Sequence, residues 1–478
     1  STRVRSSAAS DVYKRQDVNK AHILMLAKTG IISGDVAKKL LVATKQIESE
    51  KEHPTFEINP DVEDLYFNLE RYLIKLTGLE VGGQQHTARS RNDLFATEIR
   101  IDTRKVYLKL SQMFIDLRRA YLQLARKNLD TVMSGYTHMQ PSEPITFAHY
   151  LSGVSSALAR DYDRFSHAWQ SLNLCPLGGC SMGSTSFPID REYTSKLMGF
   201  DGPVQNSLDC VASRDYVLEI LTALAQTAMT MSRTALDLYN WATPEYGYIE
   251  VDDSCAVCSS IMPQKKNPFT LEHVKAKAAH MEGFMIGVYN TMKNVIFSHG
   301  RDTSVETPRY FYTALSEMEA DFALLTVTIN TLSVRKQRMY DCAARNFCTV
   351  TELANYLVRH DDISFREAHE IIAHVVGAMN EKGLTATDID RNAVEKATKE
   401  LFGFDTKLTD ELIREALDPR RVAYEKTCIG GTAPDEVSRQ LDLVEAQIKA
   451  DEDELKARQA QLDSADALLA EKVQEAIA

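Results

Sequence analysis

The chain has 478 residues, and its 55 Lys and Arg residues are outnumbered by 67 Asp and Glu residues, which gives a formal net charge of -12. This acidic excess argues against a nucleic-acid-binding protein, whose surface would carry a basic excess. Only 21 glycines and 13 prolines are present, which argues against a collagen, a low-complexity polymer or a turn-rich β-sandwich and favours a helical protein. A chain of this length is expected to form about two to four domains.

The first segment, residues 1–16, reads STRVRSSAASDVYKRQ and has neither an initiator Met nor a clear periodicity. We interpret it as a non-native tail of the kind that translated adapter sequence adds, and we exclude it from the fold. On this interpretation native sequence begins near Asp17, and part of the authentic N-terminus is missing.

Eight cysteines are too sparse in this chain to form a disulfide framework, which favours a reducing cytoplasm. The single CxxC pair, Cys255 and Cys258, has no second pair and no clustered histidines, so we interpret both residues as ordinary buried thiols and expect no metal. No run of about 18 apolar residues occurs, and no secretory pattern opens the chain. We therefore expect no membrane association and a cytoplasmic location.

Long stretches without Gly or Pro predict long helices, because these residues are the strongest helix breakers. Such stretches lie between Gly83 and Gly135, between Pro203 and Pro244, between Pro308 and Gly377, and after Pro434. In two segments the apolar residues recur every three or four positions and form one stripe per helix: Leu151, Val154, Leu158, Tyr162 and Phe165, and Val217, Leu221, Leu224, Ala228 and Met231. Helices of about 40–60 Å predict an elongated bundle, and we expect a homo-oligomer.

The C-terminal tail carries Leu441, Ile448, Leu455, Leu462 and Leu469 at seven-residue spacing. The other seam positions include Asp451 and Arg458, so only half of a coiled-coil seam is present. We expect a helix packed on its own subunit rather than an intermolecular coil.

Three dense polar clusters interrupt the predicted helices. The first, residues 82–93, is called the anion loop below and contains Ser90, Arg91 and Asn92 just before a long helix. Guanidinium groups match carboxylates two bonds at a time, and neutral donors at a helix start add to an anion site. The alternative is a capped helix start with solvated arginines.

The second cluster, residues 134–144, contains Thr137 and His138, and its His is either structural or an acid, base or proton relay. The third, residues 258–268, reads CSSIMPQKKNP and is either a polar loop or a nucleophile site. A Ser hydroxyl acts as a base only when positive potential and donated hydrogen bonds stabilise its alkoxide. Lys265 and Lys266 are candidates for supplying that potential.

Together these blocks resemble the argininosuccinate lyase family of the aspartase/fumarase superfamily, from about Asp17 to residues 430–437. The segments that carry the resemblance are HTARSRND, GYTHMQPSEPITFAH, PLGGCSMGSTSFPIDRE, NSLDCVASRDYVLE, CSSIMPQKKNP and FREAHEII. The resemblance implies an all-α, three-domain subunit with a central bundle of long helices. It also implies a homotetramer in which three subunits assemble each active site. The expected division is an N-terminal helical domain (17–93), a central bundle domain (94–345), a C-terminal helical domain (346–440) and a helical tail (441–478).

The resemblance further implies a reversible elimination that releases fumarate from an N-substituted L-aspartate without metal or organic cofactor. Ser259 matches the general base, and His138 matches the residue proposed to protonate the departing nitrogen. Glu272 matches the carboxylate that pairs with this histidine and favours its charged form. The residues that match substrate contacts are Ser90, Arg91, Asn92 and Thr137 for the succinyl group, Lys265 and Asn267 for the carboxylate that becomes the aci-carboxylate, and Ser260 and Arg301.

The sequence departs from the family where the arginine half of argininosuccinate binds. Residues 299–308 read HGRDTSVETP, so His299, Ser304 and Thr307 replace the usual Tyr, Gln and Lys. Lost polar partners discriminate against the former substrate. Smaller departures are Ala88 and Cys258 for Gly, and Phe269 for Asp. The substrate is therefore either an aminopolycarboxylate such as ethylenediamine disuccinate, towards which we lean, or argininosuccinate.

The sequence disfavours two other functions. An inactive crystallin-like structural protein would have lost the base, the acid or the carboxylate contacts, yet Ser259, His138 and Lys265 are present. An ordinary fumarase or aspartase would carry a small or apolar residue where Lys266 stands.

Overall fold

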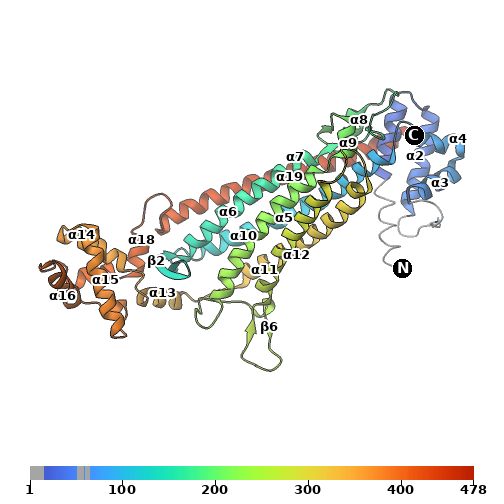
Figure 1. Ribbon diagram of the computed structural model, residues 1–478. Coiled ribbons are helices and arrows are strands. Elements are labelled where there is room, and N and C mark those ends of the chain that lie inside the picture. The colour runs from blue at the N-terminus through green and yellow to red at the C-terminus, as the bar shows by residue number, and fades with distance from the viewer. Residues whose placement is uncertain (1–15, 51–58, 60–64) are drawn as a thin grey trace.

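The computed structural model describes residues 16–50, 59 and 65–478, so most of the predicted non-native tail, residues 1–15, lies outside the described part. The molecule is a long rod of helices with a smaller helical group at each end (Figure 1). The few strands in the described chain are short, so the fold is all-α as predicted. None of the described helices is long and apolar enough to cross a membrane.

One end of the rod holds the N-terminal elements. They are a helix over residues 16–28, α2 (Gly34–Ser49), α3 (Leu65–Thr77), α4 (Leu79–Gly82) and the 3-10 turn η1 (Gly83–His86). The Ser33 side chain accepts the Val36 N–H and caps α2. Leu40 and Leu41 lie in a buried cluster. Small elements follow at this end: α7 (Trp169–Leu172), α8 (Arg191–Leu197), α9 (Ser207–Ala212), and the parallel pair β3 (Leu174–Cys175) and β4 (Gly202–Pro203).

The rod itself is built from α5 (Arg91–Arg126), α6 (Phe147–His167), α10 (Asp215–Trp241), α11 (Phe269–Met292) and α12 (Thr307–Thr331). The 36 residues of α5 span about 54 Å. The stripe predicted on α10 is buried in the main core, and the stripe on α6 is buried except for Val154, which packs against its edge. Phe114 of α5 packs edge-on against Tyr162 of α6, with 5.3 Å between the ring centroids. The long amphipathic helices were therefore predicted correctly at these positions.

The stretch between Pro308 and Gly377 is not one long helix. It contains most of α12, then β8 (Ser333–Val334), α13 (Lys336–Arg345), α14 (Val350–Asp361) and part of α15 (Phe365–Glu381). Asp362 takes a left-handed φ of 58° and stops α14, and Ser364 begins α15 with a reciprocal capping box. Polar capping residues thus end helices here without Gly or Pro. The remaining elements of this end are η4 (Ala386–Asp388), α16 (Arg391–Phe402), α17 (Asp410–Ala416) and α18 (Pro419–Tyr424).

The tail forms α19 (Pro434–Ile477), which runs back along the whole rod (Figure 1). It packs on α5 and α6 of its own chain, and reaches α2 and α8 at its end, as predicted. Leu441, Ile448, Leu455 and Leu469 are buried, and the seam residue Asp451 pairs with Arg118 of α5. The predicted boundary at residue 440 lies inside α19, and the one at 93/94 lies inside α5; the domain division stays a prediction.

Short antiparallel hairpins carry the other polar clusters. β1 (Val132–Thr137) pairs with β2 (Gln140–Thr146), and β6 (Val257–Cys258) pairs with β7 (Lys266–Asn267). A third pair joins β5 (Ile249–Glu250) to β8. The 3-10 turn η2 (Asp253–Cys255) precedes β6, and the π-helical turn η3 (Asp302–Glu306) precedes α12.

Candidate active site

The anion loop caps α5. Ser90 is the N-cap residue, and its Oγ accepts the Asn92 N–H at 3.3 Å. Asp93 closes the capping box, because its Oδ1 accepts the Ser90 N–H at 3.0 Å. The side chains of Arg91 and Asn92 thus lie at the positive end of a helix dipole, where an anion is stabilised.

Asp93 also ties this loop to the segment 176–184. Its Oδ2 accepts the N–H groups of Gly178 and Cys180, both at 2.9 Å. Asn92 Nδ2 donates to the Ser181 carbonyl at 3.0 Å. Burial raises the pKa of the Asp93 carboxyl, while the donated N–H groups act in the opposite direction. Our sequence analysis did not single out Asp93, although Ser90 followed three residues later by an acidic residue is the pattern of a capping box.

Arg91 contacts Phe67 of α3 and acts electrostatically on His299. The Arg91 guanidinium lies 4.7 Å from the Phe67 ring centroid. Burial lowers the pKa of His299, and the positive charges of Arg214, Arg301 and Arg91 lower it further. The predicted residues Arg91 and Arg301 therefore act on one imidazole, together with the buried Arg214, which has no role in the sequence prediction.

Of the three residues that depart from the family pattern, Ser304 and Thr307 form hydrogen bonds within their own chain. Ser304 Oγ donates to the Gly300 carbonyl at 2.8 Å. Thr307 is 1% exposed, and its Oγ1 donates to Met292 Sδ at 3.5 Å. His299 is half-buried, with a buried Nδ1 that has no hydrogen-bond partner in the described chain. The hydroxyls of Ser304 and Thr307 are both bonded within the chain, so neither is oriented to replace the contact that a Gln or a Lys makes with the arginine half of argininosuccinate.

Thr137 and His138 lie at the tip of the β1–β2 hairpin, beyond the opposite end of α5. Both side chains are exposed. His138 and Met139 form the tight turn between the strands, with left-handed φ angles of 54° and 58°. About 54 Å of helix separates this end of α5 from Arg91, so one chain does not bring His138 to the anion loop.

The Ser259 cluster lies on the β6–β7 hairpin, which projects from the side of the rod (Figure 1). Ser259 N donates to the Lys265 carbonyl at 3.3 Å. Ser259 Oγ accepts two backbone N–H groups, from Ile261 at 3.2 Å and from Met262 at 3.0 Å. Ser259 Oγ thus accepts the two N–H groups of a local serine turn, and donors of this kind stabilise negative charge on an oxygen.

The lysines of this hairpin are in different environments. Lys265 is exposed, and so is Ser260, while Asn267 is half-buried in β7. Lys266 pairs with Asp253 at 2.6 Å and with Glu250 at 3.3 Å, and these contacts raise its pKa. Lys266 is therefore engaged in exposed ion pairs of its own subunit, which makes Lys265 the better candidate for positive potential at Ser259.

Glu272 lies in the first turn of α11. Its Oε1 accepts the Tyr239 hydroxyl at 3.1 Å, and this bond raises the pKa of Tyr239. Lys275 Nζ lies 3.9 Å from the Tyr239 ring centroid. Among the described residues His138 makes no hydrogen bond to Glu272, so the implied pair stays a prediction for an assembly. No group of three or more metal-ligating side chains occurs in the described part of the chain.

The sequence and the fold were compared with known protein families and structures. Residues 2–283 match the lyase family, and residues 347–423 match the argininosuccinate lyase C-terminal family. A class II fumarase from Schistosoma mansoni has the same fold, with a TM-score of 0.69 at 14% identity over 87% of this chain and 91% of that one. The fold is that of the aspartase/fumarase superfamily.

Closer relatives define the branch. Argininosuccinate lyase 1 of Shouchella clausii is 45% identical over 94% of this chain and 90% of that protein. The structure of an EDDS lyase variant with bound fumarate superposes with a TM-score of 0.90 at 33% identity, over 98% of this chain and 92% of that one. The chain belongs to the argininosuccinate lyase family, and it is a carbon–nitrogen lyase that releases fumarate.

Proposed function

We propose that the enzyme cleaves an N-substituted L-aspartate with Ser259 as the base and His138 as the acid. Ser259 Oγ takes the proton from the carbon next to a carboxylate, and the electron pair of that C–H bond forms a dianionic aci-carboxylate. Collapse of this intermediate forms the carbon–carbon double bond of fumarate and breaks the C–N bond. His138 gives a proton to the departing nitrogen, directly or through water.

The observation that carries this proposal is the pair of N–H donors on Ser259 Oγ. A free Ser hydroxyl is far too weak an acid to ionise at neutral pH. Donors at 3.2 and 3.0 Å from Ile261 and Met262 favour the alkoxide, and an assembled, water-poor site increases their effect.

Carboxylate binding is assigned to two groups of residues. Ser90, Arg91 and Asn92 at the α5 N-terminus, with Arg301 beside them and Thr137 from another subunit, hold the succinyl group. Lys265, Asn267 and Ser260 hold the carboxylate that becomes the aci-carboxylate. These roles rest on the resemblance, and the cluster of Arg91, Arg301 and Arg214 around His299 supports an anion site at this end of the rod.

A homotetramer with sites shared by three subunits accounts for the separation of the clusters. One chain leaves His138 at the far end of α5 from Arg91, with Ser259 on a projecting hairpin. Several large apolar side chains of the rod are exposed in the single chain: Met229 and Leu236 of α10, Ile286 and Tyr289 of α11, and Tyr310 and Val327 of α12. Such faces fit contacts between subunits.

The preferred substrate is an aminopolycarboxylate such as ethylenediamine disuccinate. The inward-facing hydroxyls of Ser304 and Thr307 support this preference, because the Gln and Lys contacts to an arginine moiety are absent. Argininosuccinate is the second candidate, favoured by the identity to the Shouchella clausii enzyme. A reducing cytoplasm remains the prediction from the cysteines. All eight are free thiols, but Cys258 is exposed, so the expectation of a buried thiol was wrong there.

The deciding experiment measures fumarate release by the purified enzyme from ethylenediamine disuccinate and from argininosuccinate in parallel. Faster release from the first supports the proposed substrate class, and faster release from argininosuccinate overturns it. Release from neither compound would show that the amine lies outside both classes.

A further inference from the structure

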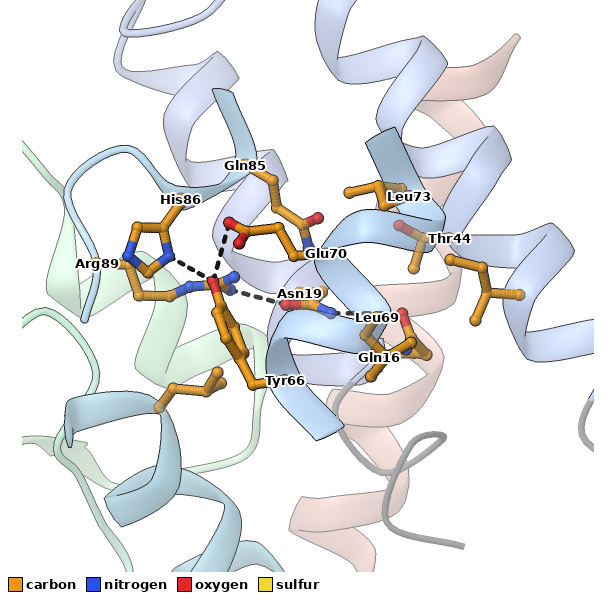
Figure 2. A pocket seen from close by; sticks show the side chains of 12 residues that line it. Gln16, Asn19, Thr44, Tyr66, Leu69, Glu70, Leu73, Gln85, His86 and Arg89 are labelled. Carbon is orange, nitrogen blue, oxygen red and sulfur yellow. Dashed lines mark hydrogen bonds between the residues drawn. The ribbon is translucent and has the colours of Figure 1, made fainter. Parts of the chain in front are cut away.

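The two ends of the rod hold their site residues in different ways. At the N-terminal end, bonds from the neighbouring helices tie down the anion loop (Figure 2). Arg89 Nη1 donates to Asn19 Oδ1 at 2.8 Å, and Tyr66 Oη lies 2.5 Å from His86 Nδ1. The hairpin that carries His138 lies at the other end of α5, so other contacts must fix it.

The β1–β2 hairpin is held only weakly by its own strands. Across the ladder, Tyr136 faces Pro141 and Ser134 faces Pro144. Proline has no N–H, so β2 cannot donate a ladder hydrogen bond at either position. The register also shifts between Ser134 and Tyr136. The turn that carries His138 therefore depends on contacts with other parts of the chain.

Close packing on α13 does not hold the tip of this hairpin. A cavity of about 910 Å³ opens between the hairpin and α13, with Tyr136 and Met139 on one side and Cys342 on the other. The side chain of Met139 is 55% exposed. Individual bonds must therefore fix the tip.

Side chains of the hairpin bond to other segments of the described chain at three positions: Ser134 with Asn346, Glu143 with Lys426, and Tyr136 with Tyr248. The distance between the Tyr136 and Tyr248 hydroxyl oxygens is 2.6 Å, and either hydroxyl can be the donor. Along the chain, Tyr136 is the closest of the three bonded hairpin residues to His138. The tyrosine bond is therefore the tether nearest to the tip.

Tyr248 is a rigid anchor for this tether. Its side chain is 1% exposed, its N–H donates to the Trp241 carbonyl at 3.0 Å, and its carbonyl accepts the Arg335 N–H at 2.9 Å. Burial raises the pKa of the Tyr248 and Tyr136 phenols. Both phenols therefore stay neutral through the range in which an imidazole titrates, and the bond between them persists across that range.

We infer that Tyr248 is a positioning residue for His138 and acts through the hydroxyl of Tyr136. This inference rests on the proposed function, because it takes His138 to protonate the departing nitrogen. Tyr136 precedes His138 by two residues, so a shift of Tyr136 moves the turn that carries the imidazole. A catalytic acid displaced by about 1 Å loses much of its effect on the rate.

The test measures kcat for fumarate release from ethylenediamine disuccinate or argininosuccinate, whichever the assembled enzyme cleaves faster. Tyr248→Phe and Tyr136→Phe each remove one hydroxyl and keep the ring. Loss of this hydrogen bond should lower kcat about fivefold in either variant. Because both changes break the same bond, the double variant should lose no more than either single variant.

Tyr246→Phe is the matched control. The Tyr246 ring packs against Tyr136 and Tyr248 with centroid distances of 5.7 and 5.6 Å, but the bond between the other two hydroxyls does not involve it. This control should keep normal kcat, and all variants should keep the mass and helical content of the wild type. Unchanged kcat in Tyr248→Phe, or a multiplied loss of about 25-fold in the double variant, would overturn the inference.

Hydrogen exchange tests the tether without a substrate. Exchange of the amides of residues 132–146 should be faster in Tyr248→Phe than in the wild type and in Tyr246→Phe, because the hairpin opens more easily. Exchange at the wild-type rate in Tyr248→Phe would contradict the tether.

The dependence on the leaving amine separates positioning of the acid from a purely structural role. The loss of kcat in Tyr248→Phe should grow with the basicity of the amine, because a displaced His138 matters most where the nitrogen needs a proton. An equal loss for every amine in Tyr248→Phe alone would refute the positioning role. An equal loss for every amine in His138→Asn would instead refute the acid role itself, and with it the proposed function.

Discussion

The buried carboxylate of Asp93 accepts the backbone N–H of Gly178, 85 residues further along the chain, at 2.9 Å. The same carboxylate accepts the N–H groups of Ser90 and Cys180. One side chain at the start of α5 thus fixes both the helix cap that presents Arg91 and the segment packed behind it.

Replacing Asp93 should damage both stability and binding. In Asp93→Asn one carboxylate oxygen, an acceptor, becomes an NH2 donor that faces backbone N–H groups. The free energy of unfolding in urea should therefore be about 1–3 kcal/mol lower than in the wild type. Fumarate affinity should also fall, because the cap of α5 shifts. The exposed Asp163→Asn on α6 is the control. Full stability and affinity in Asp93→Asn would show that the bonds to Gly178 and Cys180 do not hold the loop.

Ser259→Ala should abolish fumarate release while the assembled enzyme keeps its mass and helical content. The change removes the base but leaves the backbone donors of Ile261 and Met262 in place. Ser254→Ala, an exposed hydroxyl on the preceding turn, should keep normal turnover. A rate assay at saturating substrate measures the effect, and substantial activity in Ser259→Ala would remove Ser259 from its role.

His138→Asn should slow the cleavage of poorly leaving amines most, because only these need a proton during C–N cleavage. The measurement compares kcat for substrates whose amines differ in basicity. An equal loss for every amine would indicate that His138 orients substrate rather than protonates the nitrogen.

Asp321 predicts a specific dependence of stability on pH. It occupies a core position of α12 between Met318 and Leu325, and neither carboxyl oxygen has a hydrogen-bond partner in the described chain. Burial raises its pKa to about 8, with a small opposing effect of Lys277 on α11 and a supporting effect of Glu317 on α12. In the unfolded chain the pKa of this carboxyl is about 3.9. At a pH between this value and the folded-state pKa, Asp321 holds a proton in the folded state that it has lost in the unfolded state. Stability therefore falls as pH rises through this window.

The variant Asp321→Leu should remove this dependence. The free energy of unfolding of Asp321→Leu should exceed that of the wild type by a small amount near pH 4. This difference should grow by at least about 2 kcal/mol by pH 9. Denaturation at several pH values measures the difference. Because all other titrating groups are shared, a difference that stays constant with pH would show that Asp321 keeps an ordinary pKa.

The sequence predicted the parts of this enzyme that depend on local periodicity. The apolar stripe from Val217 to Met231 forms the buried face of α10, and the half-seam of α19 packs on its own chain. The count of Gly and Pro did not predict the helix end at Asp362. There a residue with left-handed φ ends α14, and the capping residue Ser364 starts α15. Helix ends made by side-chain caps are invisible to a count of Gly and Pro.

The site was only partly predictable, for a different reason. Motif residues such as Ser259 and Arg91 were identified, but the partners that hold them come from distant segments, as Gly178 does for Asp93. The sequence did not reveal that Lys266 pairs with Asp253, or that Thr307 is buried against Met292. These contacts depend on tertiary packing, which no local pattern specifies.

In the proposed assembly each site combines a base, an acid and a carboxylate-binding loop from different subunits. The most direct test co-expresses inactive Ser259→Ala and inactive His138→Asn chains with two different tags and purifies the hybrid oligomers. Hybrids should release fumarate although neither parent does, because some sites receive an intact Ser259 from one chain and an intact His138 from the other. Hybrids as inactive as the parents would contradict a shared site and would place Ser259 and His138 within a single subunit's site.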